Sequence, residues 1–178
     1  MQFDVSDEAP FPRPLVFRTH RDAFETIAPR LEAVDRVRLK SESRHASGIL
    51  EQTHEWWAKP SALPFFLRPI VPAEMLHWFG HTRWDPSAWI CRWRIDVPAL
   101  GPMAEIDGEQ TYEEREPGCR ITVRGRFDFH PERVEALTLP PGAVPFVERF
   151  VVGLIVPLMQ TSSQAVIAHL HDEARRSS

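Results

Sequence analysis

The side chains that could carry chemistry in this sequence are its histidines and a few acidic, amide and phenolic groups. General acid–base catalysis needs a group that takes up or releases a proton within hydrogen-bond reach of a substrate. The candidates for that work are His54 with Glu51 or Glu55, His77, Gln110 and Tyr112. Apolar residues occur at both odd and even positions of the segments 48–58 and 75–84, so the pattern does not say which of these side chains share a face. The catalytic residues, if there are any, stay unassigned at this level.

The eight histidines also raise the question of a metal site. His77 and His81 would share a strand face but lie about 13 Å apart along it, which is too far to ligate one ion. His169 and His171 point to different sides of a helix, and no cysteine or carboxylate pattern accompanies them. We therefore expect no metal and no other cofactor. The sequence also lacks the patterns GxSxG, HExxH, GxGxxG and the P-loop, so the enzyme classes that these patterns mark have no support.

The length and composition fit one domain with a substantial core. The chain has 178 residues, of which 43% are apolar and 26% charged, and its net charge is −4. A chain of this size buries roughly 70% of its unfolded surface, so we expect a single domain over residues 1–178. A nucleic-acid-binding domain normally carries a clustered basic excess. This chain has none, and we expect no nucleic acid partner.

Three features bear on the location of the protein. Residues 1–20 contain no apolar signal-peptide core. Cys91 and Cys119 are too few for a disulfide framework and fall on strands that a third strand separates, so we expect two free thiols in a reducing cytoplasm. The apolar run 150–159 is about half of the ~20 residues that a membrane span requires, so we expect no transmembrane segment.

Hydrophobic periodicity predicts the order of the elements. A first strand covers 2–5, and two short helices follow, the first opened by Pro14 and the second capped by Asp22 with Glu25 completing a capping box. A period of two then predicts six strands, which cover 34–44, 48–58, 75–84, 87–97, 103–115 and 119–129. The segment from Pro145 to about Ala174 reads as one long helix that is apolar on more than one side in its first half.

The charges on the last three strands indicate how these strands pair. Arg92 and Arg94 lie on the outward face of one strand, and acidic residues such as Glu109 lie on the next. Arg124 and Arg126 follow on the third. Opposite charges on neighbouring strands favour pairing by roughly 0.2–1 kcal/mol each, so the order basic, acidic, basic predicts an antiparallel meander with a solvated outer face.

This order of elements resembles the START-like SRPBCC superfamily, which has the helix-grip fold and includes lipid-transfer domains, birch-pollen-type allergens and polyketide aromatase/cyclases. The resemblance covers about residues 2–174 and is one of order and pattern, without a short diagnostic motif. It implies an α+β fold in which a curved seven-stranded antiparallel sheet wraps around a long C-terminal helix, with two short helices after the first strand. It also implies an apolar cavity between the sheet and that helix.

The resemblance implies that the chain binds a small hydrophobic ligand, such as a lipid, a polyketide or an aromatic metabolite, as a carrier or sensor. Two alternatives stay open, namely a polyketide cyclase-like enzyme that uses the same cavity and an interaction module with a filled core. Gly108 and Gly125 face inward and would leave room for a ligand. The side chains expected at the ligand are Trp89, Trp93, Ile106, Gln110, Tyr112, Val123, Phe127, Leu154, Leu158 and Met159.

The connection from Ala58 to Glu74 is unusually apolar for a loop and contains four prolines. Loops normally run over the surface and are polar, so an apolar loop needs a cover or a partner. We expect Phe65 and Phe66 to form a gate or a lipid-contacting lip at the cavity mouth, which would allow a transient membrane contact. Packing onto the domain's own helices and a dimer contact are the alternatives, and we expect a monomer or a weak dimer.

Overall fold

The structure is a computed structural model that describes residues 1–176 apart from 64, 66–67, 70–71 and 135–142. The strands are β1 (Gln2–Ala9), β2 (Val34–Arg44), β3 (Leu50–Ala58), β4 (His77–Asp85), β5 (Ile90–Asp96), β6 (Ala104–Arg115) and β7 (Gly118–Phe129). The α-helices are α1 (Arg13–Asp22), α2 (Phe24–Ile27) and α3 (Ala143–Arg176). Short 3-10 turns are η1 (Ala28–Arg30), η2 (Pro60–Ala62), η3 (Ala73–Leu76), η4 (Gly101–Met103) and η5 (Pro131–Arg133).

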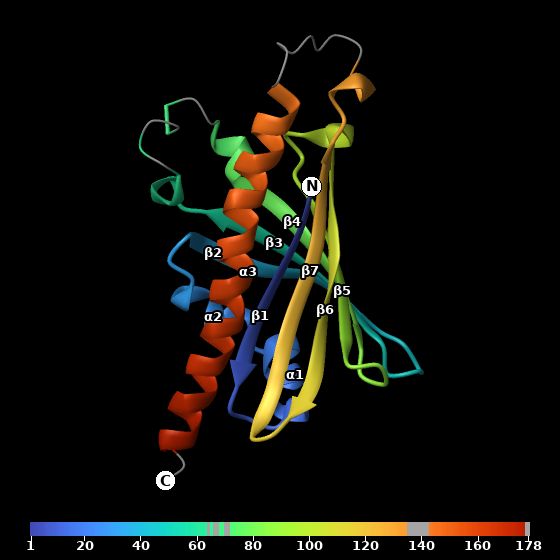
Figure 1. Ribbon diagram of the computed structural model, residues 1–178, viewed down its shortest axis with the longest axis vertical. Coiled ribbons are helices and arrows are strands. Elements are labelled where there is room, and N and C mark those ends of the chain that lie inside the picture. The colour runs from blue at the N-terminus through green and yellow to red at the C-terminus, as the bar shows by residue number, and fades with distance from the viewer. Residues whose placement is uncertain (64, 66–67, 70–71, 135–142, 177–178) are drawn as a thin grey trace.

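The strands form one seven-stranded antiparallel sheet in the order β1-β7-β6-β5-β4-β3-β2. The helix α3 runs along one side of this sheet against β1 and β7, while β2, β3 and β4 run obliquely to the direction of α3 (Figure 1). The six predicted strands, the long helix and the expected α+β architecture are therefore confirmed, with boundaries shifted by a few residues. β1 extends to Ala9, further than predicted, because it pairs with β7 along its whole length.

The second short helix begins differently from the prediction. Ala23 occupies the position before α2, and no side chain caps this helix. The Asp22 carboxylate instead accepts hydrogen bonds from the Arg21 guanidinium at 2.6 and 2.7 Å. The Glu25 carboxylate accepts a bond from the Leu39 backbone N–H at 2.7 Å. The predicted capping box is thus wrong, and Glu25 joins α2 to the edge strand β2.

The inward faces of Gly108 and Gly125 do not provide room for a ligand, contrary to the expectation from the sequence. The two glycines are paired across β6 and β7. The Trp93 and Phe3 rings stack at 6.2 Å over them, and a Cβ at Gly108 would lie only 2.5 Å from the Trp93 Cζ2 atom. The glycines are needed because two aromatic rings lie directly on the backbone of the sheet.

The strand β2 is an open edge of the sheet and carries two irregularities in its pairing with β3, after Val34 and after Leu39. Most of its side chains are exposed. The other edge is β1.

The helix α3 is apolar over a longer stretch than the run 150–159 on which the sequence prediction rested. Within Val147–Arg176, one segment of 18 residues has a mean hydropathy of 1.6, and the helix is long and apolar enough to meet a length-and-composition criterion for a membrane span. The uninterrupted apolar run 150–159 is only part of this segment. Only 29% of that segment is buried, so burial in the core does not account for all of its apolar side chains.

Cys91 lies on β5 and Cys119 on β7, with β6 between these strands. Both cysteines are buried and unpaired, so the prediction of two free thiols is confirmed. Burial raises the pKa of the Cys119 thiol to about 11 and raises that of Cys91 further.

We predict opposite effects of adding a methyl group at two glycines. Gly108→Ala should lower the free energy of unfolding by about 1–3 kcal/mol because the new Cβ meets the Trp93 ring and the β7 backbone. Gly153→Ala, on an exposed position of α3 with no atom within 4 Å of its Cβ, should raise it by about 0.5–1 kcal/mol. Urea unfolding of both variants measures this. Equal effects at both sites would contradict the close packing over Gly108.

Candidate functional site

A cavity of about 620 Å³ lies between α3 and the concave side of the sheet. Its volume falls in the range of about 300–1,000 Å³ that is typical of small-molecule sites. One wall is the α3 segment from Val151 to Ala168, and the opposite wall comes from β2, β3, β4, β5 and β6 and the connections between them. The apolar side chains that line it include Leu63, Met75, Leu76, Trp78, Ile95, Val97, Leu100, Ile106, Val151, Leu154, Ile155 and Leu158.

Few polar side chains line this cavity, and most of them already have a partner. The Arg30 guanidinium pairs with the Asp172 carboxylate at 2.6 Å. The Thr161 hydroxyl donates to the Pro157 carbonyl at 2.8 Å. The cavity therefore offers a ligand mainly apolar contact.

A smaller pocket of about 70 Å³ adjoins the cavity, and Trp78, Ile95 and Leu158 line both. We call it the inner pocket. Its character differs, because several uncharged polar side chains surround it among aromatic rings. These polar side chains are His20, His54, Thr82, Gln110 and Ser162.

His20 lies at the centre of a buried hydrogen-bond chain. Its Nδ1 is 3.1 Å from the Gln110 amide nitrogen, and its Nε2 is 3.1 Å from the Ser162 hydroxyl oxygen. Complete burial lowers the pKa of His20 to about 3, so the imidazole is neutral. With the Gln110 amide placed as it is, Nδ1 must accept, so the ring proton sits on Nε2 and is donated to Ser162.

His54 lies on β3 and is 5% exposed. Burial lowers the pKa of its imidazole, while the charges of Glu25 and Glu42 act in the opposite direction. Its ring nitrogens have no hydrogen-bond partner among the described residues. His54 therefore presents a neutral imidazole beside the inner pocket.

Similarity to solved structures is extensive. The Zhui aromatase/cyclase from Streptomyces sp. R1128 superposes with a TM-score of 0.70 at 12% identity, over 100% of this chain and 98% of that one. The ginseng major latex-like protein 151 from Panax ginseng gives 0.57 at 7% identity, over 95% and 96%. The di-domain aromatase/cyclase BexL gives 0.66 at 16% identity, over 95% of this chain and 49% of that one.

The chain adopts the helix-grip fold. This conclusion rests on the element order, the strand order and these superpositions together. No protein-family model matches the sequence, and no curated protein matches it either. At such low identities the similarity establishes the helix-grip fold and nothing about the ligand.

Six of the ten residues expected at the ligand line the large cavity or the inner pocket. Ile106, Leu154 and Leu158 line the large cavity. Trp93, Gln110 and Met159, with Leu158 again, line the inner pocket.

The other four expected residues line neither cavity. Trp89 precedes β5, has a φ of 57° and stacks under the Arg13 guanidinium at 4.5 Å, so it belongs to a turn. Tyr112 packs edge-on against Phe17 with ring centroids 5.1 Å apart. Val123 and Phe127 are buried within the core. These positions are inward as predicted, but other side chains cover them.

The acid–base candidates from the sequence do not gather at the cavity, with the exception of His54 and Gln110. Glu55 forms ion pairs with His77 and Lys40, and Glu51 pairs with Arg83. None of these side chains lines either cavity. Within the described part of the chain there is also no cluster of three side chains that could hold a metal ion.

Sequence reasoning missed His20 and Ser162. His20 falls four residues after Val16 and three after Phe17, so it shares the apolar side of α1, and this placement was a readable signal. Ser162 interrupts an otherwise apolar helical face in a similar way.

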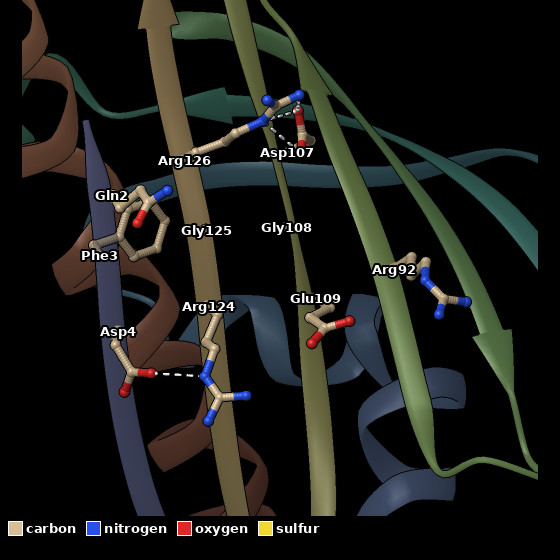
Figure 2. Close-up of a pocket in the computed structure, with 10 residues that line it drawn as sticks. All are labelled: Gln2, Phe3, Asp4, Arg92, Asp107, Gly108, Glu109, Arg124, Gly125 and Arg126. Atoms are coloured by element: carbon tan, nitrogen blue, oxygen red, sulfur yellow. Dashed lines mark hydrogen bonds and ion pairs between the residues drawn. The ribbon is translucent and has the colours of Figure 1, made fainter.

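A hollow of about 670 Å³ lies on the other side of the sheet, over β1, β7, β6 and β5 (Figure 2). Its charged side chains are largely paired with one another. Arg124 contacts Asp4 at 2.9 Å, and Arg126 contacts Asp107 at 3.0 Å (Figure 2). The hollow is wide open and its charges are balanced, as expected of a solvated sheet face.

The gate residues lie only partly within the described structure. Phe65 is 79% exposed in the β3–β4 connection, and Phe66 lies outside the described residues. Leu63 on one side of Phe65, and Met75 and Leu76 on the other, line the large cavity. The connection therefore borders the cavity, as a gate would require.

We predict that His20 makes stability depend on pH. The unfolded state binds a proton below a pKa of about 6.5, whereas folded His20 does so only near 3. Stability is therefore complete above about pH 6.5 and falls as the pH drops toward 3, by at most ~1.4 kcal/mol per pH unit. His20→Gln should lose less stability than the wild type between pH 7 and pH 5 in urea unfolding. His171→Gln, which removes an exposed imidazole of α3, is the control. Equal losses in the wild type and His20→Gln would contradict the assignment.

Proposed function

We propose that this helix-grip domain binds a small hydrophobic ligand in the large cavity, as a carrier or sensor. The observation that carries the proposal is the apolar lining of a cavity of about 620 Å³. The fold neighbours support it, because they include aromatase/cyclases and a major latex-like protein.

The size of the cavity sets the expected affinity. A ligand that buries about 300 Å² of apolar surface gains roughly 7 kcal/mol. Part of this gain offsets the translational and rotational freedom that the ligand loses. We therefore expect dissociation constants in the micromolar range or weaker for ligands that make apolar contact only. A filled-core interaction module would not need such a volume, so the cavity argues against that alternative.

A cyclase-like enzyme is the second candidate, and one observation favours it. A neutral, unpartnered His54 beside the inner pocket could accept a proton from a bound substrate. The carrier remains our main proposal because the large cavity is mainly apolar and most of its polar side chains, such as Arg30 and Thr161, are paired within the protein.

Filling the cavity tests the proposal. We expect Leu154→Trp to weaken binding of the fluorescent probe N-phenyl-1-naphthylamine at least tenfold, because Leu154 lines the cavity. Gln160→Trp adds the same ring to an exposed position of α3 outside the cavity and should change binding less than twofold. Fluorescence titration measures both. A wild type that does not bind the probe, or two variants with equal affinity, would refute the proposed site.

The exposed Phe65 allows a test of the gate. Phe65→Ser should change the association and dissociation rates of the same probe several-fold, while the melting temperature shifts by less than about 2 °C because the ring is 79% exposed. Stopped-flow fluorescence and thermal melts measure the two effects. Unchanged rates, or a large fall in the melting temperature, would remove Phe65 from the gate.

A further inference from the structure

The inner pocket has hydrogen-bonding groups that the apolar large cavity does not need. Polar side chains that are buried normally have all their hydrogen bonds made within the protein. Among the described residues around the inner pocket, three side chains depart from this rule. The buried Nε1 of Trp93 on β5 has no hydrogen-bond partner, and Ser162 of α3 and His54 of β3 can each make a further hydrogen bond.

The Ser162 hydroxyl stands at the end of a directional chain. The Gln110 amide donates to His20, and His20 Nε2 donates to the Ser162 oxygen. The Ser162 proton is then left to be donated elsewhere. In a helix it could return to the carbonyl four residues earlier, that of Leu158, but the structure shows no such bond from Ser162. No acceptor for Ser162 exists among the described residues.

The His54 imidazole is another such group, with no hydrogen bond to any residue that the structure describes. His54 is only 5% exposed, and this burial favours the neutral form of its imidazole. A neutral imidazole has one N–H donor and one acceptor nitrogen. Its neighbour across the sheet is Gly80, which has no side chain that could bond to it and which also lines the inner pocket.

The size of the inner pocket matches a functional group and not a whole molecule. Its volume of about 70 Å³ compares with about 30 Å³ for one water in the liquid. Since Trp78, Ile95 and Leu158 line both spaces, a ligand body in the large cavity can reach in with one end.

The charge of the ligand group that enters the inner pocket is also constrained. Among the described residues, Arg94 is the one cationic residue around the inner pocket, and its guanidinium is bound to Asp96 at 2.9 Å with the side chain 63% exposed. An anionic group would therefore be buried without a counter-charge, which is costly. A neutral oxygen avoids this cost.

We propose that the inner pocket recognises a neutral oxygen, of a carbonyl or hydroxyl group, at the deep end of the hydrophobic ligand. Ser162 donates its proton to this oxygen, and His54 supplies a second hydrogen bond. His20 and Gln110 are positioning residues that orient Ser162. This inference rests on the proposed function and names the ligand class: apolar molecules with one uncharged oxygen function.

A matched pair of ligands tests the inference. Naphthalene and 2-naphthol have nearly the same shape and differ by one hydroxyl. We expect the wild type to bind 2-naphthol about tenfold more tightly than naphthalene, because a hydrocarbon leaves the Ser162 and His54 groups unpaired. Isothermal titration calorimetry measures both affinities.

Variants test which side chains cause the preference for 2-naphthol over naphthalene. Ser162→Ala and His54→Leu should each bring the ratio of the 2-naphthol and naphthalene affinities toward one, because they remove the groups that a hydrocarbon leaves unpaired. Ser163→Ala is the control, because this neighbouring serine is buried but does not line the inner pocket. It should keep the preference of the wild type.

A measurement on the wild type covers the case in which a variant does not fold. The infrared carbonyl stretch of bound 2-acetylnaphthalene should shift to lower frequency than in hexane, toward its value in water. Equal affinity of the wild type for naphthalene and 2-naphthol, with an unshifted carbonyl band, overturns the inference and leaves the proposed function standing. Failure of N-phenyl-1-naphthylamine and of both naphthalenes to bind overturns the two together.

Discussion

The close approach of two aromatic rings to the sheet at Gly108 and Gly125 organises the rest of this domain. Because neither glycine has a Cβ, Trp93 and Phe3 lie directly on the backbone of β6 and β7. This part of the concave face is filled. The free volume is displaced toward α3 and the strands β4 and β5, where Trp78 and Ile95 line both cavities.

The resulting interior combines two environments in one continuous space. The large cavity is apolar and lies beside an α3 segment whose apolar residues, such as Leu154 and Leu158, are only half-buried by protein. The inner pocket is surrounded by uncharged polar groups held in place by a chain through His20. Such a division suits a ligand with a hydrophobic body and a single polar end.

The sequence allowed the fold to be predicted well, because strands with one buried face have a clear period of two and the apolar α3 stands out after them. The candidate site was harder to predict from the sequence. A period of two tells which face of the sheet Tyr112 or Phe127 occupies, but not whether another side chain covers it, as Phe17 covers Tyr112. The polar chain through His20 depends on α1, β6 and α3 meeting in space, and no local pattern encodes such a meeting.

The open edge strand β2 has a consequence for association between copies of the chain. An exposed edge can add a further strand from another molecule and so seed aggregation. On β2, exposed charges such as Arg36, Arg38 and Lys40 follow one another along the strand, and irregular pairing with β3 interrupts its regular geometry. Charges and bulges of this kind oppose strand addition. The Glu25 carboxylate of α2 also occupies the Leu39 N–H of this strand, so charges, bulges and a helix together protect the β2 edge from polymerisation.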